Sequence, residues 1–216
     1  MKKTIISLTL IIFTITTYSQ DDVYSYSENG IVNRIIIDNN YFVMTSYKVD
    51  TNKFVKTIGG FYSENDNKLN VDLEFNSNYK NDSISKIEIE KKANWKKISL
   101  KENDLQGKWL MVGRVRNGNE QRRNLDRPRK TMKFLINGYF QWIAFNTETF
   151  QFSGSGGGKY ITKDGKYIES IEYFSRDDSK VGLNLEFDYE LINKEWNHKG
   201  FSSKGDPLHE IWVVRK

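Results

Sequence analysis

The sequence has no cysteine, two prolines and two histidines among its 216 residues. The absence of cysteine excludes disulfides, thiolate metal sites, cysteine nucleophiles and a lipid anchor attached to cysteine. Two histidines argue against a centre with several imidazole ligands, so we expect no metal and no other cofactor. No Ser-His-Asp order and no pair of carboxylates suited to catalysis stands out. We therefore expect a protein that binds rather than catalyses.

Long hydrophobic runs are also missing after residue 20. At the N-terminus, two lysines precede an apolar stretch of about a dozen residues, which is too short to span a bilayer comfortably. Small residues at Thr17 and Ser19 favour cleavage before Gln20. We predict a signal peptide over residues 1–19 and a secreted or periplasmic protein with no transmembrane segment once the signal is removed. An uncleaved anchor helix is the alternative.

The composition favours strands over helices. Hydrophobic residues make up only 38% of the chain, but aromatic residues make up 14%, which is enough to build a core. Loss of the two N-terminal lysines lowers the formal net charge from +5 to +3. The secreted protein would be only mildly basic, and with no recognised binding motif we expect no nucleic-acid partner.

An internal repeat organises the chain. A shift of 98 residues aligns residues 38–77 with 136–175 without a gap and gives 12 identical pairs in 40 positions. These pairs include Tyr41/Tyr139, Gly59/Gly157, Gly60/Gly158 and Glu74/Glu172. A period near 100 is the size of a small domain. We predict a first domain over residues 20–100 and a second over residues 101–216, joined near Ser99–Asn103.

Short runs of aromatic and β-branched residues, separated by turn residues, predict an all-β fold. In the second repeat we expect eight strands, near 107–116, 131–137, 139–147, 150–162, 166–175, 181–193, 195–202 and 208–215. In the first repeat we expect seven, near 23–28, 32–38, 41–49, 53–63, 67–76, 84–91 and 94–99. Asp66 and Asp164 should lie in matching hairpin turns.

The expected strands alternate in polarity. The clearest case predicts one buried face, formed by Leu183, Leu185, Phe187, Tyr189 and Leu191. Eight sequential strands with short links suit a closed up-and-down barrel, which removes the edge strands. The shorter first repeat would form a partial barrel, and a β-sandwich remains the rival architecture.

The second repeat opens with Gly107-Lys108-Trp109 and ends with Arg215 on its last strand. This resembles the lipocalin-like (calycin) pattern, which implies that Arg215 packs over Trp109 and closes the barrel. The stretches "LQGKWLMVGR", "GKYIESIEYFSRDDSKVG" and "GDPLHEIWVVRK" are more similar still to an uncharacterised family of secreted bacterial proteins with lipocalin-like domains, here in tandem. The resemblance implies the fold and secretion but no activity.

A basic segment runs from Arg114 to Lys130 and carries seven cationic and two acidic residues. In a lipocalin-like barrel this segment would be the long loop that folds over the open mouth. Arginine pairs well with phosphate, sulfate or carboxylate. We take Arg114, Arg116, Arg122 and Arg123 as candidate ligand-binding residues. A solvated loop, or one paired with the acidic first repeat, is the alternative.

Aromatic residues inside the barrel could line a cavity. The candidates are Phe140, Trp142, Tyr160, Tyr173, Phe187, Tyr189 and Trp196, and a filled core is the alternative. Their polar groups need partners if buried, and these could come from Gln141, Glu169, Glu172, Arg114 and His198.

Three further patterns receive structural interpretations. "GSGGGKY" lacks the spacing of a phosphate-binding loop, and its match to Gly59-Gly60 indicates a strand bulge or bend. His198 and His209 do not have the spacing of a metal site. The repeated carboxylates Glu74 and Glu172 either face water, which we favour, or pair with an inward arginine.

Three functions remain open at this point. The first is a non-catalytic protein that binds a small amphipathic or anionic molecule in the second barrel. The second is an interaction module with filled barrels that contacts an envelope polymer or another protein. The third is a hydrolase or isomerase in the same barrel.

Overall fold

The computed structural model describes residues 21–100 and 103–215. The predicted signal peptide over residues 1–19 lies outside the described residues. Strands dominate, and the described ranges contain one short helix, α1 (Tyr79–Asp82), and one 3-10 turn, η1 (Asp178–Lys180). None of the helices within these ranges is long and apolar enough to cross a membrane.

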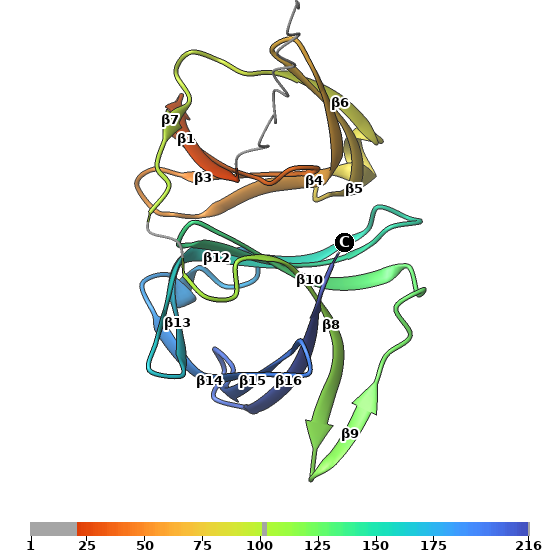
Figure 1. Cartoon of the computed structure of the whole chain (residues 1–216). Helices are drawn as coiled ribbons and strands as arrows, with labels where there is room; N and C mark the ends of the chain where they lie inside the picture. The colour runs from red at the N-terminus through yellow and green to blue at the C-terminus, as the bar shows by residue number, and fades with distance from the viewer. Residues whose placement is uncertain (1–20, 101–102, 216) are drawn as a thin grey trace, which may run out of the picture.

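The first repeat forms an antiparallel sheet of seven strands in the order β6-β5-β4-β3-β2-β1-β7. This sheet is curved but does not close, and Figure 1 shows it as an open trough above the second repeat. Its strands are β1 (Asp22–Glu28), β2 (Ile31–Ile37), β3 (Tyr41–Lys48), β4 (Phe54–Asn65), β5 (Lys68–Asn76), β6 (Lys86–Glu90) and β7 (Lys96–Lys97).

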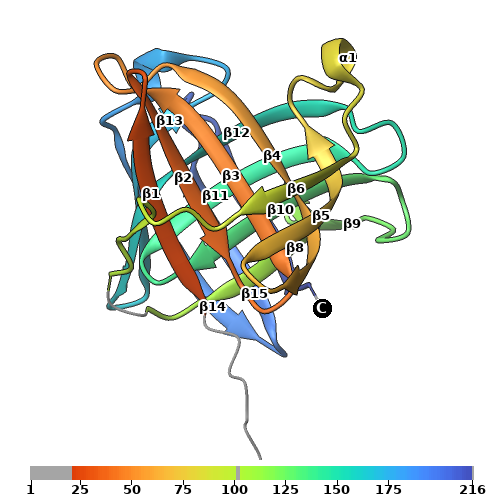
Figure 2. The same ribbon diagram turned by 90° about the horizontal axis from the view of Figure 1, so that it is seen from above.

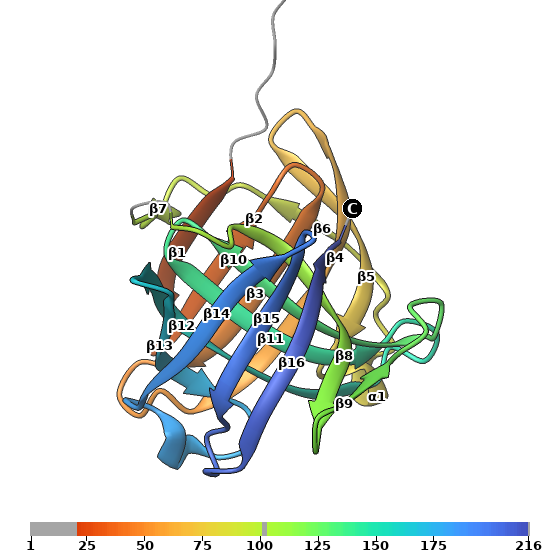
Figure 3. The ribbon, with the colours of Figure 1, turned by 60° about the horizontal axis from the view of Figure 1, so that its bottom comes forward.

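The second repeat forms a closed barrel of eight antiparallel strands, β8 and β10 to β16, because β8 pairs with both β16 and β10. Among the described strands, β9 pairs with β8 alone, and it extends beside the barrel (Figure 3). The strands are β8 (Gly107–Arg116), β9 (Asn119–Arg122), β10 (Arg129–Ile136), β11 (Tyr139–Asn146), β12 (Phe152–Lys163), β13 (Lys166–Phe174), β14 (Asn184–Ile192), β15 (Glu195–Phe201) and β16 (Pro207–Val214).

The expected strands, turns and bulges are found. Asp66 and Asp164 have positive φ angles of 54° and 51° in equivalent hairpins. The strand register shifts between Gly59 and Gly60, and again at the equivalent pair in β12. A Cβ atom on Gly60 would lie 1.9 Å from the Asp72 carbonyl oxygen, so the bulge requires glycine there. Strand β9, inside the basic segment, was not expected.

The predicted buried face of β14 is only partly correct. Phe187 is buried, and Leu185 and Tyr189 are half-buried. Leu183 and Leu191 remain 38% and 52% exposed. Leu183 lies just before β14 and Leu191 is its second-last residue, so both are at the ends of the predicted face.

The convex side of the first sheet packs on the barrel wall formed by β10 and β11. One core cluster contains residues of both repeats, among them Tyr41 and Phe75 from the first sheet and Phe134, Ile143 and Phe145 from the barrel. Figure 2 shows the strands of the two layers crossing at a steep angle. The opposite face of β10 and β11 lines the barrel. These strands are therefore buried on both sides, which explains their long apolar sequences.

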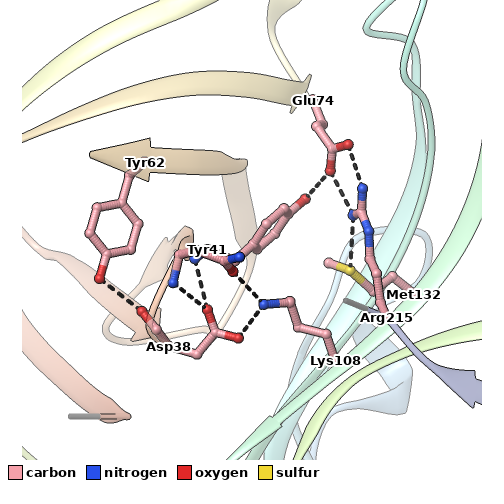
Figure 4. A network of polar contacts seen from close by, with 8 residues as sticks. Asp38, Tyr41, Tyr62, Glu74, Lys108, Met132 and Arg215 are labelled. Atoms are coloured by element: carbon pink, nitrogen blue, oxygen red, sulfur yellow. Dashed lines mark hydrogen bonds and ion pairs between the residues drawn. The ribbon is translucent and has the colours of Figure 1, made fainter. Parts of the chain in front are cut away.

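Paired charges link the two repeats at this interface (Figure 4). Lys108 of β8 is buried and contacts Asp38 and, at 2.6 Å, the Asn40 side chain. Arg215 forms an ion pair with Glu74 instead of packing over Trp109, as the resemblance had implied. Its guanidinium lies 5.3 Å from the ring centre of Tyr41. The barrel seam is closed by the backbone, where the Arg215 amide donates to the Lys108 carbonyl at 2.7 Å.

Candidate functional site

The barrel contains a cavity of about 920 Å³ that opens to solvent. This volume lies in the range of small-molecule sites. Successive side chains of a strand point to opposite faces, and this alternation explains the lining. Strand β11 places Phe140, Trp142 and Ala144 toward the cavity and the residues between them toward the first sheet. The remaining apolar lining comes from Leu110, Met111, Leu125, Ile171, Phe174, Leu185, Phe187 and Leu208.

The opening of the cavity is strongly basic. Nine cationic residues line the cavity together with three acidic ones, Glu169, Asp177 and Glu210. The cationic residues come from the β8–β10 segment, from β10 itself and from two other loops, and they are Arg114, Arg123, Arg127, Arg129, Lys130, Lys133, Arg176, Lys180 and Lys204. Burial, together with the positive charge of Arg114 and Arg129, lowers the pKa of Arg123.

A buried ion pair lies at the inner end of the cavity. The Lys133 ammonium donates to Glu169 at 2.6 Å, and the Tyr167 hydroxyl donates to the same carboxylate oxygen at 2.8 Å. The ammonium also lies 4.7 Å from the ring centre of Tyr167 and 5.2 Å from that of Trp196. Since two donors and several ring faces compensate the buried charges, this pair can be accommodated in the apolar interior.

His198 of β15 lies beside this pair and is 1% exposed. Among residues 21–100 and 103–215, neither of its ring nitrogens has a hydrogen-bond partner, and Nδ1 is 3.6 Å from a Glu210 oxygen. Burial and the nearby Lys133 charge lower the pKa of His198 to about 4. The imidazole is therefore neutral at neutral pH. Glu210 is held in turn by Arg114 at 2.9 Å.

Five of the residues selected from the sequence line the cavity, and they are Arg114, Arg123, Phe140, Trp142 and Phe187. Two others, Tyr160 and Trp196, are buried in the aromatic core of the barrel. Arg116 is exposed on β8 and does not line the cavity.

The other three selected residues lie elsewhere because of their contacts. Tyr173 faces the first sheet and stacks on Tyr47, with ring centres 5.3 Å apart. Tyr189 donates its hydroxyl to Asp104. Arg122 turns away from the cavity and pairs with Glu195 at 2.7 Å and with Glu120.

Several cavity residues were not selected from the sequence. Lys133 lies two positions before Leu135 on β10 and shares its inward face, so strand alternation could have identified it. Glu169 was expected only as a hydrogen-bond partner for buried rings, and it does serve Tyr167. Arg176 and Lys204 come from loops far from the basic segment, and no sequence pattern links them to the mouth.

The described part of the chain contains no cluster of three His, Asp or Glu side chains that could hold a metal ion. His198 and Glu210 are adjacent, but His209 of β16 contacts Asn197 at 3.1 Å instead of joining them. The arrangement offers an apolar wall, a neutral buried imidazole and a cationic mouth, which suits noncovalent binding of an anion with an apolar body.

No curated protein matches the chain. A family model described as "Domain of unknown function (DUF4488)" matches residues 104–215. The match begins just before β8 and ends just after β16, so it covers the closed barrel and excludes the first sheet. The chain belongs to this family, the domain of unknown function DUF4488.

Proposed function

We propose that the protein is a secreted, non-catalytic binding protein whose lipocalin-like barrel holds a small amphipathic anion. The observation that carries this proposal is the cavity of about 920 Å³ with an aromatic wall and a cationic opening. An apolar body would rest on Phe140, Trp142 and Phe187, and an anionic group would lie at the opening near Arg123. Burial of the body contributes about 25 cal/mol per Å² of apolar surface removed from water.

Residues 123–130 would form a lid over the opening, as the long loop of a lipocalin-like barrel would. Six of these residues line the cavity, and they are Arg123, Asn124, Leu125, Arg127, Arg129 and Lys130. Leu125 adds an apolar side chain to this part of the lining. Strand β9 extends beside the barrel (Figure 3), so the lid would be shorter than the basic segment suggested.

Native mass spectrometry tests the proposal. The full chain would be exported to a bacterial periplasm, purified without detergent and measured with and without added dodecanoate. We expect an added mass that disappears on denaturation. If neither a retained molecule nor dodecanoate is observed, the binding function is wrong, and the alternative of an interaction module with a surface partner gains support.

A pair of single variants locates the site. Arg123→Glu reverses a charge at the opening and is expected to abolish retention, whereas Lys163→Glu reverses an exposed charge at the end of β12 and should leave retention unchanged. Equal retention by both variants would exclude the opening as the anion site.

The proposed export is tested on the same sample. N-terminal sequencing is expected to give Gln20 as the first residue, in keeping with a bacterial envelope or extracellular location. A mature protein that still begins at Met1 would contradict cleavage.

A further inference from the structure

The charges that line the cavity do not balance. Each of the three acidic residues pairs with one cation: Glu210 with Arg114 at 2.9 Å, Glu169 with Lys133 at 2.6 Å and Asp177 with Lys180 at 3.7 Å. Within residues 21–100 and 103–215, no ion pair reaches the other six cations, which are Arg123, Arg127, Arg129, Lys130, Arg176 and Lys204. The cavity therefore carries a surplus of six positive charges.

This surplus is assembled from separate parts of the chain. Arg123, Arg127 and Arg129 belong to the segment before and at the start of β10, whereas Arg176 follows β13 and Lys204 lies between β15 and β16. Arg176 is held in place by two hydrogen bonds to the Ser153 carbonyl, at 3.0 and 2.7 Å. A single solvated basic loop, which was the alternative interpretation of the basic segment, does not explain why cations from three separate loops meet at one opening.

Like charges at one opening repel one another. The lowered pKa of Arg123, which burial and the neighbouring arginines cause, is one sign of this repulsion. A bound anion with a single charge would neutralise one of the six cations. An anion with two charges and three oxygens neutralises two and accepts hydrogen bonds from several guanidinium groups at once.

We infer that the anionic group of the ligand is a phosphate monoester, attached to an apolar body that enters the barrel. This inference rests on the proposed function, because it names the chemical class of the amphipathic anion. The geometry that supports it is the convergence of six unpaired cations above an apolar wall.

The test compares four probes with the same alkyl chain by isothermal titration calorimetry on the purified protein at pH 8. These are dodecyl phosphate, the monoanionic diester methyl dodecyl phosphate, dodecyl sulfate and dodecanoate, all used below their micelle concentrations. We expect dodecyl phosphate to bind at least about tenfold more tightly than each monoanion, since it makes an additional charge-assisted contact.

Two outcomes of this comparison distinguish a failure of the phosphate inference from a failure of the proposed binding function. Equal affinity for all four probes would leave an amphipathic anion as ligand but overturn the phosphate monoester, whereas no binding of any probe would overturn both. Inorganic phosphate serves as a competitor and is expected to displace dodecyl phosphate only at a large excess. Displacement at equal concentration would identify free phosphate as the ligand and overturn the apolar body.

Matched triple variants assign the preference to the opening. R123Q/R127Q/R129Q is expected to reduce the preference for dodecyl phosphate over its methyl diester to about twofold or less. K48Q/K53Q/K163Q removes the same number of exposed charges away from the cavity and should keep the preference. Loss of preference in both variants would indicate a general charge effect and contradict the site.

Discussion

Arg215 of the second repeat binds both carboxylate oxygens of Glu74 in the first repeat, at 2.7 and 2.6 Å (Figure 4). The Tyr41 hydroxyl donates to the same carboxylate at 2.6 Å. The guanidinium also lies over the rings of Tyr41 and Phe61, 5.3 and 5.0 Å from their centres. One carboxylate thus connects Arg215, just after β16, to the middle of the first sheet.

A related ion pair occurs at the equivalent glutamate, with the roles of the repeats exchanged. Glu172, the repeat equivalent of Glu74, pairs with Arg34 of the first sheet at 2.8 Å. Arg34 lies 4.5 Å from the ring centre of Tyr139, which is the equivalent of Tyr41. The preference for water at these two carboxylates was therefore wrong. Each repeat supplies the arginine that neutralises the glutamate of the other.

We predict that Arg215→Met destabilises the protein by roughly 2–4 kcal/mol, because it leaves the Glu74 carboxylate unpaired at a mostly buried interface. The side chains of Arg215 and Glu74 are only 11% and 16% exposed. Chemical denaturation measures the free energy of unfolding. Adding Glu74→Gln to this variant should restore part of the loss.

The control for this prediction is an exposed pair in the first sheet. Lys68 and Glu88 are 51% and 54% exposed, so Lys68→Met should leave the free energy of unfolding nearly unchanged. If Arg215→Met costs no more than Lys68→Met, the pair does not hold the two repeats together.

Strand positions were predictable from the sequence because alternation, turn residues and the repeat are local signals. The pairing of the repeats was not, since it depends on which face of β10 and β11 meets the first sheet. Tyr173 illustrates the difficulty: its ring was assigned to the cavity, but it stacks on Tyr47 across the interface. Tyr173 lies on β13, where alternation places it on one of two faces but does not say which face lines the cavity.

The bulge glycine Gly158 offers a second test of the fold. A Cβ atom there would lie 2.0 Å from the Ser170 carbonyl oxygen, which belongs to the backbone and cannot move aside easily. We predict that Gly158→Ala costs roughly 3 kcal/mol or more. Gly118 has open space around its Cβ position but a φ of +75°, so Gly118→Ala should cost only about 1 kcal/mol. Thermal unfolding of both variants would show the difference, and equal costs would contradict a bulge that requires glycine.

His198 predicts a pH dependence of stability. Its folded pKa of about 4 lies below the ordinary 6.5 because burial and Lys133 disfavour the imidazolium. Between pH 6.5 and 4 the unfolded chain therefore binds a proton at this position that the folded protein does not. As the pH falls through this interval, the contribution of His198 to stability should decrease by on the order of 3 kcal/mol in total, and this contribution should not change further below about pH 4.

The contribution of His198 can be separated from that of other acid-sensitive groups. His198→Phe removes the titrating ring and should flatten this part of the pH profile of unfolding free energy. His209→Gln changes a half-buried histidine on the next strand and should keep most of the fall. A profile for His198→Phe that parallels the unsubstituted protein would show that the ring does not remain neutral when buried.

The candidate site was predictable in part. Residues on regular strands, such as Phe140 and Phe187, were identified because alternation follows the barrel wall. The loop residues were harder to predict. Arg122 and Arg123 are adjacent in sequence, but the Arg122 side chain pairs with Glu195 whereas the Arg123 side chain lines the opening. Charge alone does not determine such orientations, and the three loops that meet at the mouth are distant in sequence.

The last prediction tests whether the apolar body of a ligand enters the barrel. Ala144 is 4% exposed and lines the cavity, so Ala144→Trp would fill part of the interior. Displacing two methylene groups of a dodecyl chain costs about 1.6 kcal/mol, or roughly fifteenfold in affinity. The loss should be similar for dodecyl phosphate and dodecanoate, because the change leaves the cationic opening intact. Ile161→Trp, at a position 50% exposed on β12, is the matched control and should bind as before. Undiminished binding by a folded Ala144→Trp protein would place the alkyl chain outside the barrel, with the anion alone held at its mouth.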